Sequence, residues 1–305
     1  MSGHTVGRFA PTPSGRLHLG NLLCAMLAYL SARSEGGRFL LRVEDVDAPR
    51  CPERLTRQCL EDLRFLGFDW DEPPVLQSRR TQAYEDALSQ LDAMGLIYPC
   101  FCTRAQLHEA APNEGDTQFV YAGTCARLSP REAAARMITR KPSLRVRVPH
   151  EVVSFEDRLC GRVSEDLARD CGDFVVRRSD GLFGYQLAVV VDDAFSGVTQ
   201  VVRGRDILTS TPRQLFLQRA LGLAQPEYFH IPLLRDAQGR RLAKRDHDLD
   251  LSALAKRRSA AEILGALAFS CGVLDENRPA TLEELVPLFS WDKVRQEDIR
   301  LPEGL

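Results

Sequence analysis

The order of apolar residues in the first part of the chain restricts its fold more than any other feature. Residues 6–10 and 39–43 are short apolar runs, and between them residues 19–30 repeat leucine and methionine at helical spacing until two glycines end the pattern. Residues 52–66 give a second helical pattern. Short apolar strands that alternate with helices predict a parallel α/β sheet, because each helix returns the chain to the start of the next strand.

Later segments predict further strands and a helical tail. Two short alternating patterns predict strands at residues 144–148 and 152–155. The continuous apolar run at 185–191 predicts a buried strand of the main sheet. Helical spacing at 260–269 and 282–288 predicts a small, mostly helical tail.

The loss of periodicity after a helical pattern at residues 84–94 indicates an insertion into the sheet domain. We therefore expect four parts, in chain order: the first half of the α/β domain at 1–98, the insertion at 99–172, the second half of the domain at 173–235, and a loop with a helical tail at 236–305.

Composition narrows the class of protein. With 305 residues, 44% of them hydrophobic, the chain can bury more than one packed unit. Its net charge of -2 gives no overall basic field, so any RNA contact must use a local surface. Residues 1–9 lack an apolar signal core, and no stretch approaches the roughly 20 apolar residues of a membrane span. We expect a cytoplasmic monomer that does not bind membranes.

Residues 8–21 join the first strand to the first helix and predict an anion-binding turn. His18, Gly20 and Asn21 lie at the expected helix start, where free backbone N–H groups and a partial positive charge attract phosphates. Gly20 allows a nucleotide to lie close to the backbone. By itself, the pattern is equally typical of a capped amphipathic helix with an incidental histidine.

This run resembles the glutamyl and glutaminyl branch of class I aminoacyl-tRNA synthetases, whose first strand and helix carry an arginine, a Pro-[ST]-[PT]-[ST]-Gly stretch and the HIGH signature. Pro11 to Asn21 matches that region, with Asn21 in place of the final histidine; an amide can still donate to a phosphate. The resemblance implies a Rossmann-type catalytic domain that uses ATP with Mg²⁺, with Ser14, His18, Gly20 and Asn21 around the phosphates.

The second nucleotide motif of that family, KMSKS, corresponds to Arg241–Arg245, where only the second lysine, Lys244, is kept. A mobile ammonium at this position can follow the charge that develops on the α-phosphate as pyrophosphate leaves. The pentapeptide alone is more typical of a solvated basic loop, but its order after the other motifs favours the functional interpretation. The implied catalytic residues are His18, Gly20, Asn21 and Lys244.

Residues 185–214 are similar, nearly residue for residue, to the glutamyl-synthetase segment that ends the catalytic sheet. The alternative is an ordinary polar strand end followed by a surface arginine and a helix start. The resemblance implies that Arg8 and Arg203 contact the substrate carboxylates, Arg203 that of the side chain, because the planar guanidinium can bond both oxygens. Glu44 would pair with the ammonium. Activation needs no general base, since the carboxylate is ionised at neutral pH. The implied glutamate-binding residues are Arg8, Ala10, Thr12, Glu44, Tyr185 and Arg203.

Nine cysteines, an odd number in a chain without a signal sequence, favour reduced thiols or a metal site over a disulfide framework. Cys100, Cys102 and Cys125 with Tyr121 offer three thiols and a phenol, a group suited to tetrahedral Zn²⁺. From spacing alone, His108 is the better fourth ligand. The glutamyl-queuosine tRNA(Asp) synthetases carry the same Cys-x-Cys and Tyr-x3-Cys, and this resemblance implies one structural zinc held by all four residues in an acceptor-binding-like insertion. The other cysteines are expected to be buried: Cys24, Cys51, Cys59, Cys160, Cys171 and Cys271.

About sixty residues follow Lys244. We therefore expect a helical stem-contact region and no anticodon-binding domain. The resemblance implies activation of L-glutamate with ATP in the absence of tRNA, then transfer from glutamyl-adenylate to the cyclopentenediol of queuosine in the anticodon loop of tRNA(Asp). Two alternatives stay open: a truncated glutamyl-tRNA synthetase that charges a tRNA 3′ end, and a non-catalytic tRNA-binding paralogue, which the altered KMSKS-like motif allows.

Overall fold

A computed structural model describes residues 5–103, 105–106, 120–235 and 251–300. Its largest sheet has seven strands in the order β3-β2-β1-β9-β10-β6-β7. All neighbours in this sheet are parallel except β6 and β7. The strands are β1 (Val6–Phe9), β2 (Arg38–Val43), β3 (Val75–Leu76), β6 (Val152–Asp157), β7 (Gly161–Asp166), β9 (Gln200–Gly204) and β10 (Glu227–Ile231). The expected parallel α/β sheet is confirmed.

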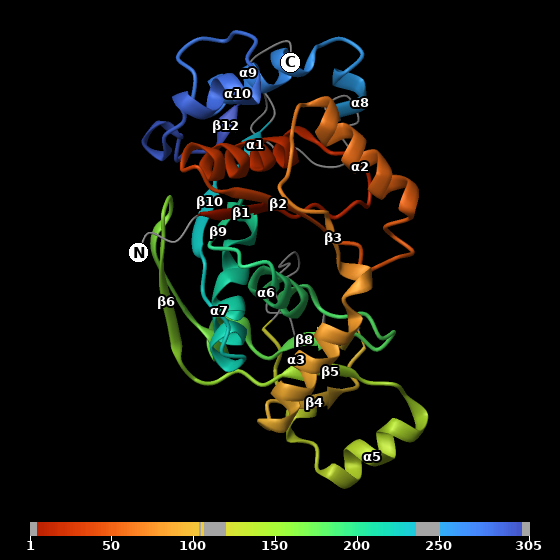
Figure 1. The fold of residues 1–305 in the computed structure, drawn as a ribbon. Coiled ribbons are helices and arrows are strands. Elements are labelled where there is room, and N and C mark those ends of the chain that lie inside the picture. The colour runs from red at the N-terminus through yellow and green to blue at the C-terminus, as the bar shows by residue number, and fades with distance from the viewer. Residues whose placement is uncertain (1–4, 104, 107–119, 236–250, 301–305) are drawn as a thin grey trace.

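Helices cover both faces of this sheet (Figure 1). On one face α1 (Leu19–Ser34) packs against β1 and β9, and its leucines join a core that continues into the C-terminal helices. The opposite face packs against α3 (Thr81–Ala93), α6 (Tyr185–Phe195) and α7 (Thr211–Ala220) in a second core. The helix expected at residues 52–66 is α2 (Glu53–Phe65).

The expected strand at residues 185–191 is wrong, because this segment forms α6. The helix is surrounded by protein, and its buried residues include Leu187, Val189 and Val190 as well as Asp192 and Asp193. A helix buried on nearly all sides has no polar stripe, so its sequence is as continuously apolar as that of a buried strand.

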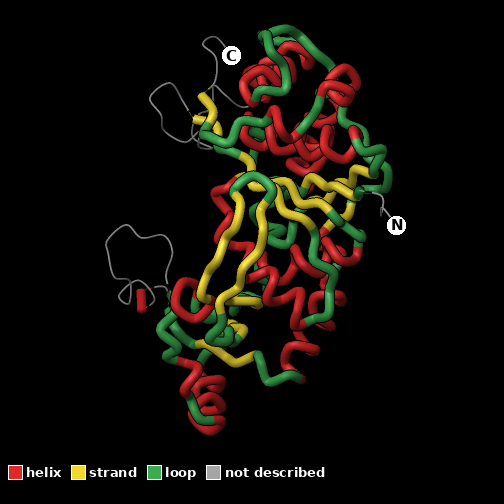
Figure 2. Tube along the Cα trace, turned by 90° about the vertical axis from the view of Figure 1, so that its left-hand side faces the viewer, coloured by secondary structure: helices red, strands yellow, loops and turns green. Residues whose placement is uncertain are grey.

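A smaller antiparallel sheet lies at the far end of the molecule from the C-terminal helices (Figure 1). It has the order β4-β5-β8, with β4 (Ile97–Cys100), β5 (Ser143–Val146) and β8 (Phe174–Arg177), and α5 (Pro130–Thr139) projects beyond it. Between β5 and β8 the chain leaves this sheet, and the long β6-β7 hairpin runs back to the main sheet (Figure 2). Asp157 at the end of β6 pairs with Tyr228 of β10 there.

The C-terminal region is mostly helical, as expected. It contains α8 (Leu251–Leu254), α9 (Ala260–Cys271) and α10 (Leu282–Leu285), and a short strand, β12 (Ile299–Arg300), pairs with β11 (Leu234–Arg235). Trp291 stacks on Phe229 of β10, with 4.4 Å between ring centroids. No helix within the described ranges is long and apolar enough to span a membrane.

Candidate active site

A cleft of about 460 Å³ opens at the carboxyl ends of β1, β2, β9 and β10. Open α/β sheets bind ligands at this edge, because the loops that follow parallel strands meet there. Ser14 is outside the lining, and the segment 241–245, including Lys244, lies outside the described residues. Nine residues expected from the sequence line the cleft: Arg8, Ala10, Thr12, His18, Gly20, Asn21, Glu44, Tyr185 and Arg203.

The start of α1 forms one side of the cleft. The backbone N–H of His18, the N-cap residue, donates to Asn21 Oδ1 at 3.2 Å, as in a capping box, so the asparagine uses its oxygen at the helix start and keeps its amide N–H groups as donors. A side chain at Gly20 would lie 3.1 Å from the His18 ring. Glycine at this position therefore leaves the ring where it is and keeps the backbone of the first turn open to a ligand.

Two buried arginines, Arg8 and Arg42, share one carboxylate on the face of the sheet. Arg8 Nε lies 3.2 Å from Asp193 Oδ1 of α6, and Arg42 Nη1 contacts the same oxygen. Arg42 also lies 3.4 Å from Glu44, whose other oxygen accepts from Thr12 Oγ1 at 3.4 Å. Burial raises the pKa of Glu44, while Arg42 and Arg8 act against that rise. The expected ammonium partner is therefore held at the end of β2.

Arg203 of β9 is buried beside the cleft and is fixed by three side chains. Its Nε donates to His230 Nε2 at 2.9 Å, Nη1 to Gln214 Oε1 at 2.8 Å, and Nη2 to Thr211 Oγ1 at 2.7 Å. A guanidinium has five N–H bonds, so these three contacts leave one N–H on each terminal nitrogen. Tyr185, the first residue of α6, lines the same cleft.

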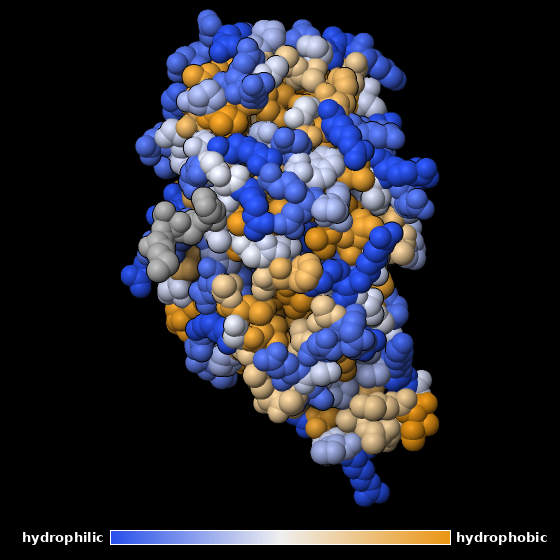
Figure 3. All heavy atoms as spheres, viewed as in Figure 1, coloured by the Kyte–Doolittle hydropathy of each residue, from blue (hydrophilic) through white to orange (hydrophobic). Residues whose placement is uncertain are grey.

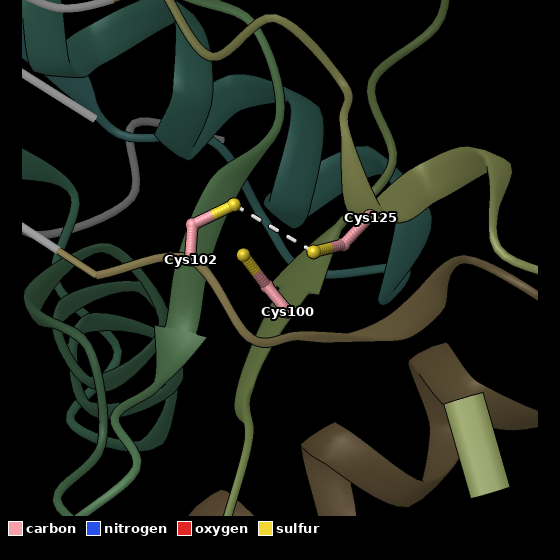
Figure 4. A group of neighbouring side chains, drawn as sticks. All are labelled: Cys100, Cys102 and Cys125. Atoms are coloured by element: carbon pink, nitrogen blue, oxygen red, sulfur yellow. Dashed lines mark hydrogen bonds between the residues drawn. The ribbon is translucent and has the colours of Figure 1, made fainter. Parts of the chain in front are cut away.

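The cysteine group lies at the small sheet (Figure 4). The sulfur atoms of Cys100, Cys102 and Cys125 all lie within 4.8 Å of one another, and Tyr121 Oη is 3.5 Å from Cys100 Sγ and 3.6 Å from Cys102 Sγ. Zinc–sulfur bonds of about 2.3 Å place tetrahedral sulfurs about 3.8 Å apart. The four atoms fit a zinc ion. His108, the alternative fourth ligand, lies outside the described residues.

The prediction that the remaining six cysteines are buried is only partly right. Cys51, Cys59, Cys171 and Cys271 are buried, whereas Cys24 is partly exposed and Cys160 is exposed. Cys160 lies in the turn between β6 and β7, where the hairpin leaves its side chain at the surface.

Residues 4–261 match the family of tRNA synthetases class I (E and Q), catalytic domain. A glutamyl-Q tRNA(Asp) synthetase of Symbiobacterium thermophilum is 47% identical over 97% of this chain and 95% of its own length. One from Nitratidesulfovibrio vulgaris is 46% identical, over 93% of this chain and 91% of the relative. The chain belongs to the glutamyl-Q tRNA(Asp) synthetase family.

Solved structures agree with this family at the level of the fold. The glutamate tRNA ligase of Elizabethkingia meningosepticum, solved with its amino acid, aligns with a TM-score of 0.85 over 98% of this chain and 67% of its own. The glutamate-tRNA synthetase of Elizabethkingia anophelis aligns with a TM-score of 0.86 over 99% of this chain and 68% of its own. Both are 23% identical to this chain, so the likeness concerns the fold alone.

Four buried residues behind the cleft lining were not among the site residues expected from the sequence: Arg42, Asp157, Asp193 and His230. Arg42 carried a usable signal, because an arginine inside the otherwise apolar strand Arg38–Val43 requires a buried partner. Asp157 and His230 carried none, since their contact depends on β6 lying beside β10.

Proposed function

We propose that this chain activates L-glutamate with ATP and transfers the glutamyl group to queuosine in tRNA(Asp). A single observation carries the first half of the proposal. One cleft joins two buried arginines, a partly buried glutamate and the N-terminus of α1. Those groups match the charges of glutamate and of the ATP phosphates. We further propose that the enzyme is cytoplasmic and monomeric.

The residues of the cleft can catalyse activation by positioning glutamate and ATP and by stabilising the charge on the phosphates. Arg203 offers its two remaining N–H groups to the side-chain carboxylate, and Glu44 receives the ammonium. Arg8 then lies on the side of the α-carboxylate, which attacks the α-phosphate as pyrophosphate leaves. His18, Gly20 and Asn21 face the phosphates at the start of α1, with Ser14 and Lys244 as further contacts.

The proposal includes one structural zinc ion held by Cys100, Cys102, Tyr121 and Cys125. When bound, the ion would cross-link β4 to the segment that precedes α5, in a part of the chain whose own core is small. The donor set supports this, because three thiols and a phenol meet in one cluster in which all but Cys102 are buried.

The tRNA contact is proposed at the end of the molecule that carries α5. This helix has no buried residue and presents Arg131 and Arg136 to solvent, as does Arg140 directly after it. Apolar side chains gather over the same tip in Figure 3, and Ile138 there is 87% exposed. A local basic surface suits RNA phosphates in a chain whose net charge is slightly negative.

Two assays test the function. We expect glutamate-dependent exchange of labelled pyrophosphate into ATP without tRNA, and transfer of labelled glutamate to tRNA(Asp) that carries queuosine but not to the unmodified transcript. Nuclease fragments then locate the label. Label on the 3′ adenosine would indicate ordinary charging, and a complete lack of exchange would indicate a non-catalytic tRNA-binding protein.

A further inference from the structure

His230 connects Arg203 to a carboxylate that the family motifs do not include. Its Nδ1 lies 2.5 Å from Asp157 Oδ2, and its Nε2 accepts from Arg203 Nε at 2.9 Å. The three residues come from adjacent strands, β6, β10 and β9, and each is at most 4% exposed. A neutral imidazole therefore bridges a buried negative charge and a buried positive one.

The contacts permit one tautomer of this histidine. Arg203 Nε carries a hydrogen and can only donate, so His230 Nε2 must offer its lone pair. The proton then lies on Nδ1, where Asp157 accepts it. The Thr211 hydroxyl, 3.2 Å from the same Nε2, accepts from Arg203 and can donate to the ring. Two donors thus point at one nitrogen.

Hydrogen bonds to both carboxylate oxygens hold the Asp157 side chain in one orientation. Its Oδ1 accepts from the backbone N–H groups of Leu159 at 3.1 Å and Cys160 at 2.9 Å, which leaves Oδ2 for the histidine. On the other side of Arg203, the Gln214 amide donates to Gln186 at 2.8 Å, so its oxygen must face the guanidinium. Every neighbour of Arg203 is therefore oriented by a further hydrogen bond.

We propose that Asp157 and His230 are positioning residues for Arg203, which fix its guanidinium so that the two remaining N–H groups face the side-chain carboxylate of glutamate. This inference rests on the proposed function. The paired N–H groups select a carboxylate over an amide, because the NH₂ of glutamine has no acceptor to meet there. A residue from the β6-β7 hairpin thereby contributes to amino-acid selection in the cleft.

The decisive variant is Asp157→Asn, which preserves size. The backbone donors at Leu159 and Cys160 retain the amide oxygen, so the NH₂ group faces His230. The ring must then accept at Nδ1 and carry its proton on Nε2, opposite the N–H of Arg203. Two donors facing each other displace the guanidinium.

We expect Asp157→Asn to raise the KM for glutamate in pyrophosphate exchange between about 10-fold and 100-fold, with a smaller change in kcat, and to weaken discrimination against glutamine.

The His230 variants separate the acceptor from the ring. His230→Gln keeps an acceptor for Arg203 and is expected to retain most of the affinity for glutamate, whereas His230→Leu removes the acceptor and is expected to lose that affinity. In the His230→Leu background, where residue 230 can no longer connect residue 157 to Arg203, Asp157→Asn should have no further effect on KM. Asp166→Asn is the matched control, since Asp166 also accepts from two backbone N–H groups but has no histidine partner within the described residues.

Nitrogen NMR of the His230 ring adds a measurement independent of activity: the proton is expected on Nδ1 in the wild type and on Nε2 in Asp157→Asn. An unchanged KM in an active enzyme, or an equal KM increase in both the histidine and leucine backgrounds, would overturn the inference. If Asp157→Asn does not fold, equal KM values for His230→Gln and His230→Leu would overturn the inference. Absence of exchange in the wild type contradicts the proposed function instead, and the ring tautomer still tests the geometry.

Discussion

Single buried charges behind the lining of the cleft are held by specific partners. Burial alone would raise the pKa of Asp193, but Arg42 and Arg8 outweigh it and lower that pKa below its ordinary value. The carboxylate is thus ionised at neutral pH and keeps two arginines close together. Without it, Arg8 and Arg42 would repel each other in a region that water does not screen.

Asp193→Asn should therefore lower the free energy of unfolding by about 3–5 kcal/mol, the usual cost of leaving a buried charge unpaired. Urea denaturation measures this. The control is Asp69→Asn, because Asp69 pairs with Arg33 but its side chain is 73% exposed, and such a pair contributes at most about 1 kcal/mol. Equal losses in the two variants would show that the buried pair has no special role.

At the scale of elements, the segments around the cysteines have only a small core of their own. That core contains five buried residues and is separate from the two large cores on the faces of the main sheet, one of which includes residues of β5 and β8. A bound metal compensates for a small core by cross-linking segments that are distant in sequence. The three cysteines belong to two segments separated by residues 103–124.

We expect Cys125→Ser to abolish stoichiometric zinc binding, measured by metal analysis of purified protein, and to increase hydrogen exchange in β4 and β5. Cys160→Ser, at the exposed turn of the β6-β7 hairpin, should retain one zinc per chain. Zinc content that is the same in wild type and Cys125→Ser would remove Cys125 from the ligand set.

For the whole molecule, stability should depend on the neutrality of His230. Burial lowers the pKa of His230 below its ordinary value of 6.5, Asp157 acts against this, and Arg203 adds to it. A lowered pKa means that the unfolded chain binds the proton more readily. The stabilisation is therefore complete above pH 6.5 and is lost as the pH falls through the folded-state pKa.

The free energy of unfolding, measured by chemical denaturation, should accordingly decrease in the wild type as the pH is lowered from 8 to 5. The decrease should be at most about 1.4 kcal/mol per pH unit for one proton. The fall should be shallower in His230→Gln. Asp157 and Asp193, whose pKa values are also lowered, lose their stabilising contribution at still lower pH. Identical slopes in both proteins would exclude His230 as the source.

The amino-acid sequence by itself determined the parallel sheet and most of the cleft. Arg8, Glu44 and Arg203 follow or end apolar strands, and the carboxyl ends of parallel strands must meet at one edge. Tertiary structure alone decided that residues 185–195 form a helix, because burial of most of its surface removes the periodicity that separates helix from strand. It alone also brought Asp157 to His230, since strand order in a sheet depends on packing between segments and leaves no local pattern in either one.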